Sequence, residues 1–250
     1  MSPMHAAAIL AAGLVAGTIN TVVGSGTLVT FPVLLGFGYA PVVANVSNTI
    51  GLVPGSAAGA VGYRRELIGQ RRRIVPLAIA SLLGGVGGAA LLLTLPASAF
   101  KAIVPAFIGI AVVLIVVQPR LSRALEARGA PARKRAGVPA TLAVFASGVY
   151  GGYFGAAQGI LLLAILGLAL EDDLQRINAL KVVLAGLVNL VAGVIFACVA
   201  HVAWLPALLI AAGSILGGIL GARHGRRLPP AALRALIVLV GVVAIVRLLA

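Results

Sequence analysis

Two polar stretches interrupt the apolar sequence, and their residues have the types that bind small anions. They lie within residues 20–27 and 150–159, and glycines in both allow bends that would strain other residues. A helix that restarts after a bend exposes free N–H groups and the positive end of its dipole, which favour an anion. For any single glycine, close helix packing is the alternative. For the paired breaks we expect a substrate site with these residues: Asn20, Gly24, Ser25, Gly26, Thr27, Tyr153, Gln158 and Gly159.

A second polar group follows each break. Asn45, Ser47 and Asn48 follow the first break, and Asn178 and Lys181 follow the second. Amides and hydroxyls can donate to an oxyanion, and Lys181 could supply the positive charge that an anion needs in a low-dielectric interior. Two alternatives stay open. Lys181 could extend to the lipid headgroups, and Asn45 and Asn178 could cap the helices at whose starts they lie.

The first half of the chain recurs in the second half at an offset of about 133 residues. Asn45 matches Asn178, Gly26 matches Gly159, and Asn48 aligns with Lys181. The arginine-rich loop 62–73 aligns with residues 195–206, which hold no Lys or Arg, so the two copies do not share a side of a membrane. This pattern predicts two inverted repeats, which is typical of transporters whose substrate site lies at the bilayer midplane.

The composition places the chain in a membrane. It is 61% hydrophobic and 10% charged, with a mean hydropathy of +1.15, so it cannot form a water-soluble surface. Its apolar stretches have helix-spanning lengths, and the alternating pattern of an outer-membrane barrel is absent. The net charge of +14 comes from short clusters between apolar segments, which indicate topology and predict no nucleic-acid partner.

The predicted fold is an all-α polytopic membrane protein of eight to ten membrane segments. Segments 27–37 and 158–170 are too short to span comfortably, so each can form a broken or re-entrant hairpin with its predecessor. The expected apolar segments are 5–23, 27–37, 42–61, 74–94, 102–117, 138–154, 158–170, 178–197, 203–221 and 232–249.

We expect a first repeat at residues 1–117, a basic cytoplasmic linker at 118–137 and a second repeat at 138–250. The arginine clusters should face the cytoplasm, with both termini outside a bacterial inner membrane. The first segment has no basic region before it, which favours a membrane helix over a cleaved signal peptide.

An intramembrane enzyme is an alternative hypothesis. Ser25 lies between two glycines, but no histidine lies in the interior of an apolar segment to act as its base, since His5 is terminal, so we expect no catalytic residue. The single cysteine excludes an internal disulfide and a cysteine-based metal cluster, and we expect neither metal nor cofactor. An anion channel and a scaffolding protein are further alternatives. The expected partners are a small anion, the lipid bilayer and, as an option, a second copy of the chain.

The same residues resemble the sulfite exporter TauE/SafE family over nearly the whole chain. The resemblance is carried by these motifs: Ala16-Gly17, Gly24 to Leu28, Phe31 to Leu35, Ala44 to Asn48, and Trp204 ahead of Gly217 to Gly221. It implies an inner-membrane permease that moves small sulfur-containing anions, such as sulfite or organosulfonates, usually outward. Family members usually carry three glycines where this chain has Gly24-Ser25-Gly26, so the chain adds a hydroxyl to the expected site.

Overall fold

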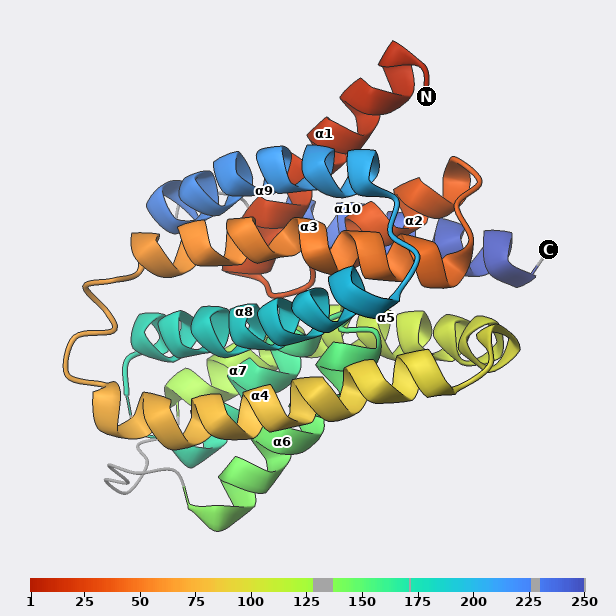
Figure 1. Ribbon diagram of the computed structural model, residues 1–250. Coiled ribbons are helices and arrows are strands. Elements are labelled where there is room, and N and C mark those ends of the chain that lie inside the picture. The colour runs from red at the N-terminus through yellow and green to blue at the C-terminus, as the bar shows by residue number, and fades with distance from the viewer. Residues whose placement is uncertain (128–136, 171, 226–229, 250) are drawn as a thin grey trace.

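The computed structural model describes residues 1–127, 137–170, 172–225 and 230–249, and these form ten helices without a strand (Figure 1). This confirms the predicted all-α polytopic membrane fold. The helices are α1 (Pro3–Val22), α2 (Thr27–Gly36), α3 (Pro41–Gly62), α4 (Arg71–Thr94), α5 (Ala97–Ala127), α6 (Val138–Tyr153), α7 (Gln158–Ala169), α8 (Leu174–Val199), α9 (Trp204–His224) and α10 (Pro230–Leu249).

Within the described residues, α1, α4, α5, α8 and α9 contain stretches long and apolar enough to cross a membrane. Helix α3 has 22 residues, but its asparagines, serines and prolines lower its hydropathy. Helices α2 and α7 have 10 and 12 residues, which confirms that the two expected short segments are short helices. Three of the predicted site residues, Asn45, Ser47 and Asn48, lie on α3 and are among these polar residues.

The largest difference from the sequence prediction is the length of α5. We predicted an apolar segment ending at residue 117 and a linker from 118, whereas α5 continues to Ala127. Residues 120–127 are rich in Leu, Ala, Arg and Glu, which favour helix, so the helix continues after the apolar run has ended. Hydropathy marks where a helix leaves lipid and does not mark where it ends. The rest of the predicted linker, residues 128–136, lies outside the described residues.

Helix packing follows the same scheme in both halves. Helix α1 packs against α9, as α6 packs against α4, and the short helices α2 and α7 each contact the helix that precedes them. A Cβ atom at Gly84 of α4 would lie 2.3 Å from the carbonyl oxygen of Phe145, and one at Gly217 of α9 would lie 2.0 Å from that of Leu14. Glycine thus allows backbone contact at equivalent places in both halves.

At the centre, α3 packs against α8, and the two helices run in opposite directions (Figure 1). Such reciprocal pairing is what a two-fold axis between the halves would produce. The inverted orientation of the repeats relative to a bilayer stays a prediction.

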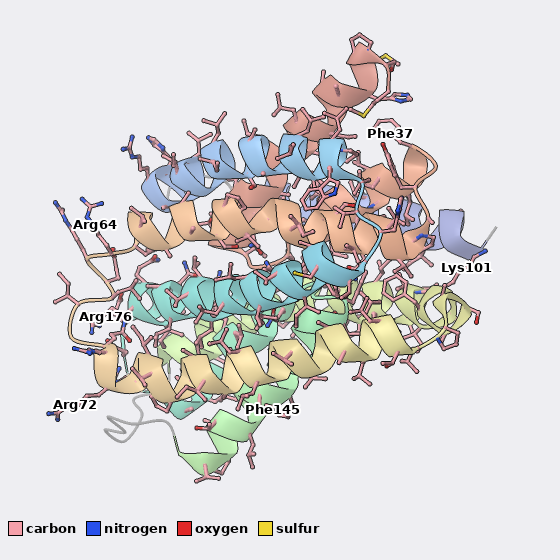
Figure 2. The ribbon with its side chains drawn as sticks, viewed as in Figure 1. Phe37, Arg64, Arg72, Lys101, Phe145 and Arg176 are labelled. Atoms are coloured by element: carbon pink, nitrogen blue, oxygen red, sulfur yellow. The ribbon has the colours of Figure 1, made fainter. Side chains whose placement is uncertain are left out.

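Charged residues gather at one end of the helix bundle, which we call the arginine end. Arg64, Arg72 and Arg176 lie there, and Lys101 lies at the opposite end (Figure 2). His5, near the start of α1, stacks on Phe37 at a ring-centroid distance of 4.3 Å, so the N-terminus lies at the end opposite the arginines. The separation of charge predicted from the loops is therefore present in the fold.

Candidate functional site

The two helix breaks predicted from the glycines lie against each other. Helix α1 ends at Val22 before Gly24, whose φ is 93°, and α6 ends at Tyr153 before Ala157, whose φ is 60°. These two left-handed residues occupy equivalent places in the two halves. The Gly159 N–H donates to the carbonyl oxygen of Gly24 at 3.0 Å, and a Cβ atom at Gly24 would lie 2.5 Å from the Cα atom of Gly159. A side chain at either glycine would force the breaks apart.

Several donors at these breaks have no protein acceptor. The Ser25 side chain is 1% exposed, and its hydroxyl has no hydrogen-bond partner among the described residues. The Gly26 and Thr27 N–H groups, at the start of α2, have no backbone acceptor among the described residues. The Gln158 amide nitrogen, at the start of α7, is buried and unpartnered as well. Two helix N-termini thus present unpaired donors where the halves meet, an arrangement that suits an anion.

Asn45 and Asn178 each bond to the other half of the protein. The Asn45 amide donates to the Tyr153 carbonyl oxygen at 2.9 Å, and the Asn178 amide donates to the Thr21 carbonyl oxygen at 3.4 Å. These carbonyls belong to the last turns of α6 and α1, where the carbonyl groups have no N–H partner within their own helix. Capping of their own helices was therefore wrong for both: α8 is capped by Asp173, and α3 has no side-chain cap.

Asn20, Ser47 and Asn48 of the first half form hydrogen bonds within the protein. The Asn48 amide donates to Thr27 Oγ1 at 3.2 Å and its oxygen accepts from Thr30, so it holds the first turn of α2. The Asn20 amide donates to Ser56 Oγ at 3.3 Å. Ser47 accepts from the Ala203 N–H at 2.9 Å, which ties α3 to the start of α9. The hydrogen bond of Ser47 is thus made to the start of α9 and not to either helix break.

Lys181 lies inside the protein. Its side chain is 1% exposed, and Nζ donates to the Thr21 carbonyl oxygen at 3.2 Å, the same oxygen that accepts from Asn178. Extension to the lipid headgroups was therefore wrong. Both ion pairs found in the described residues involve Asp172, so no carboxylate there pairs with Lys181. A buried ammonium with only a carbonyl partner is an unfavourable arrangement that an anion would relieve.

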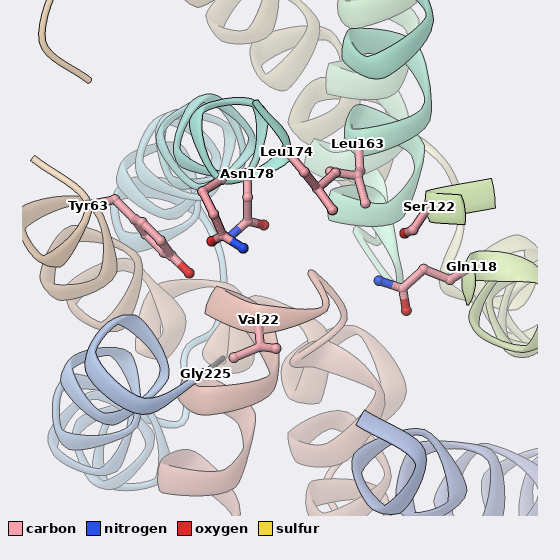
Figure 3. A pocket seen from close by; sticks show the side chains of 9 residues that line it. Val22, Tyr63, Gln118, Ser122, Leu163, Leu174, Asn178 and Gly225 are labelled. Atoms are coloured by element: carbon pink, nitrogen blue, oxygen red, sulfur yellow. The ribbon is translucent and has the colours of Figure 1, made fainter. Parts of the chain in front are cut away.

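A cavity of about 110 Å³ reaches this region from the arginine end, and the sequence analysis did not identify it. Asn178 of α8 and Gln118 of α5 both extend into it from opposite walls (Figure 3). Its lining is completed by Val22, Tyr63, Ser122, Leu163, Leu174, Gln175 and Gly225. Gln118 and Ser122 were missed because both fall in the stretch predicted as linker, and their place in α5 depends on the extension of that helix.

Aromatic side chains gather beside the second break. Phe154 contacts Phe31, Phe100 and Phe107 with ring-centroid distances of 5.2, 6.0 and 6.3 Å, and Tyr153 contacts Phe100 and Phe107 as well. We call these five residues the aromatic cluster. Phe107 and Gln118 lie about three turns, or roughly 16 Å, apart along α5, so the cluster and the cavity lie toward opposite ends of that helix. The cluster joins residues of α2, α5 and α6 and of the turn after α6, which are far apart in the sequence, so no local pattern indicated it.

Comparison with known proteins supports one family. The family model described as sulfite exporter TauE/SafE matches residues 9–248. The chain is 28% identical to the probable membrane transporter protein ORF9 of Sinorhizobium sp., over 96% of this chain and 90% of that protein. It is 25% identical to the probable membrane transporter protein YfcA of Escherichia coli (strain K12), over 100% of this chain and 91% of that protein. No solved structure matches the chain at a significant level. The chain therefore belongs to the TauE/SafE family and is a multi-pass membrane transporter.

Proposed function

We propose that this transporter moves a small sulfur-containing anion, of the sulfite or short organosulfonate class, through a site between the two helix breaks. The observation that carries the proposal is the burial of Lys181 without a carboxylate partner in the described residues. An anion bound beside it would supply the missing negative charge. The unpaired donors at Ser25, Gly26 and Gln158 would then have oxygen atoms to bind.

The distribution of acidic residues favours an anion over a cation. Glu66, Asp172 and Asp173 lie in connections between helices, and among the described side chains no carboxylate is found at the breaks. A sodium or metal site in the membrane interior requires oxygen ligands with negative charge. The matching family model is described as a sulfite exporter, which supports a sulfur oxyanion within the broader class of anions.

Transport would proceed by alternating access. The cavity leads from the arginine end to Asn178, and the Thr21 carbonyl oxygen accepts hydrogen bonds from both Asn178 and Lys181. The aromatic cluster fills the space on the opposite side of the break. The positive-inside rule favours a cytoplasmic arginine end and an inner-membrane location with external termini. Export would then be electrically downhill for an anion, because the cell interior is negative.

Counterflow in proteoliposomes tests this proposal. Vesicles that contain the protein are loaded with unlabelled sulfite, and a trace of labelled sulfite is added outside. Transient accumulation of label is expected for the natural protein and for Lys101→Ala, which alters an exposed lysine at the opposite end. Lys181→Ala should abolish it.

The outcomes separate the alternatives. Equal counterflow in both lysine variants would contradict a role for Lys181 in the anion site. Anion conductance without counterflow would indicate a channel. Counterflow with another small organic anion, but not with sulfite or a sulfonate, would leave the site in place and overturn the substrate class.

A further inference from the structure

A second, larger cavity lies at the arginine end, between the C-terminal ends of α3 and α9. It measures about 540 Å³, and three arginines line it. Arg64 and Arg65 follow the end of α3, and Arg223 lies in the last turn of α9. Arg64 extends outward at this end in Figure 2. The lining is completed by Ala58, Val61, Gly62, Glu66, Ile219 and Ala222.

The cavity carries an excess of positive charge. Three guanidinium groups line it against one carboxylate, that of Glu66, so the formal excess is two. Arg64 donates to the Val61 carbonyl oxygen at 3.4 Å, whereas Arg65 and Arg223 form no ion pair with any carboxylate of the described residues. Exposed guanidinium groups that converge from two elements bind phosphate oxygens well, since each presents paired donors in one plane.

Below the arginines, the wall of the cavity is apolar and faces outward. Val61 of α3 is 62% exposed, and Ile219 and Ala222 supply the apolar lining from α9. Ile219 and Arg223 are four residues apart, so they lie on one face of α9, beside Ala222. Gly62 and Ala222 are in such close contact that a Cβ atom at Gly62 would lie 2.2 Å from that of Ala222, which makes the groove between α3 and α9 shallow. An exposed apolar wall of this kind favours contact with acyl chains over contact with water.

We propose that this cavity binds the headgroup of an anionic phospholipid, with an acyl chain lying along the groove between α3 and α9. A cationic rim directly above an exposed apolar wall matches a phosphodiester joined to a hydrocarbon chain. A free phosphate would use only the rim. The bound lipid would hold the ends of α3 and α9 together in the leaflet on the arginine side.

Lipid-dependent stability tests the proposal. The purified protein is placed in detergent micelles that contain phosphatidylglycerol or phosphatidylcholine, its unfolding temperature is measured, and retained lipid is counted by native mass spectrometry. Phosphatidylglycerol should raise the unfolding temperature and remain bound. Loss of both arginines in Arg65→Gln/Arg223→Gln should weaken its binding roughly 30-fold. Arg72→Gln, which removes an exposed arginine outside the cavity, should leave the binding unchanged.

Three results would overturn the proposal. Equal unfolding temperatures of the natural protein in the two lipids would exclude selective binding, and this comparison needs no variant. Equal losses in Arg72→Gln and in the double variant would assign the effect to general surface charge. Equal stabilisation by soluble glycerol 1-phosphate at matched concentration would show that the headgroup anion alone is bound, without a membrane lipid.

Discussion

Ser25 and Ser81 have the same local chemistry in different places. Both side chains are buried, at 1% and 0% exposure, and neither hydroxyl has a hydrogen-bond partner among the described residues. Ser25 lies between the two glycines of the first break, whereas Ser81 lies inside α4. The two serines therefore differ in location, at the break or within a helix, and not in the state of the hydroxyl group.

We expect Ser25→Ala to reduce sulfite counterflow and Ser81→Ala to leave it unchanged. Because neither hydroxyl has a partner, each substitution should alter the free energy of unfolding by less than about 1 kcal/mol. Ser214→Ala gives the matched stability control, since its hydroxyl donates to the Gly51 carbonyl oxygen at 2.9 Å and its loss should cost about 1 kcal/mol. Parallel loss of transport in the Ser25 and Ser81 variants would argue against Ser25 as a ligand.

Gly24 combines a left-handed backbone with contact to the second break. Gly24→Ala should destabilise the protein by more than the roughly 1–3 kcal/mol of backbone strain alone, because the added Cβ atom would also meet the Gly159 backbone at 2.5 Å. Gly36→Ala is the control, since no atom lies within 4 Å of a Cβ atom built there. Thermal unfolding in detergent measures both. Similar stability of the two variants would mean that the breaks separate without difficulty.

At the scale of elements, Asp172 joins the beginnings of α4 and α8. Its carboxylate accepts from Arg73 at 2.6 Å and pairs with Arg176 at 2.8 Å. Burial raises the pKa of the Asp172 carboxyl, but the hydrogen bonds from Arg176 and Arg73 lower it by more, so the pKa lies below its ordinary value. The ionised form is thus favoured in the folded protein.

The depressed pKa fixes the direction of the pH dependence. The stabilisation is fully present above the unfolded-state pKa of about 3.9 and is lost as the pH falls through the lower folded-state value. Asp172→Asn should therefore reduce stability by on the order of 1 kcal/mol at pH 7 and have little effect near pH 2. Unfolding curves across this range test the expectation, and a penalty that does not shrink in acid would exclude the ion pairs as its cause.

The aromatic cluster is expected to close the side of the break opposite the cavity. Phe100→Leu/Phe107→Leu reduces the cluster while it retains apolar packing, and should raise the passive leak of sulfite from loaded vesicles. Phe145→Leu alters a phenylalanine of α6 that is 40% exposed and outside the cluster, so it should not change the leak. If all three proteins leak equally, the cluster has a packing role only.

At the scale of the whole molecule, the charge distribution predicts one orientation. In a Cys198→Ser background, His201→Cys places a thiol in the exposed connection between α8 and α9, and Arg72→Cys places one at the arginine end. A membrane-impermeant maleimide should label His201→Cys in intact spheroplasts, and should label Arg72→Cys only after permeabilisation. The reverse pattern would place the arginine end outside and would reverse the expected transport direction.

Local information in the sequence was sufficient to predict the helices of this protein and the breaks between them. Hydropathy over about 20 residues marks a membrane helix, and glycines between apolar runs mark the breaks, so all the expected segments except the one at α5 agree with the helices to within four residues at both ends. The residues of the family resemblance lie in the same local motifs. These signals depend only on neighbouring residues, and tertiary contacts did not alter them.

The partners of the polar side chains were decided only by the tertiary structure. The bonds from Asn45 to Tyr153 and from Lys181 to Thr21 join residues 108 and 160 positions apart, and no local pattern specifies such pairs. For the same reason the sequence left the role of Lys181 open between the headgroups and the interior. The sequence by itself determined a duplicated helical membrane transporter with two breaks. The contact between those breaks, the cavity, the aromatic cluster and the burial of Lys181 depend on how the two halves pack together.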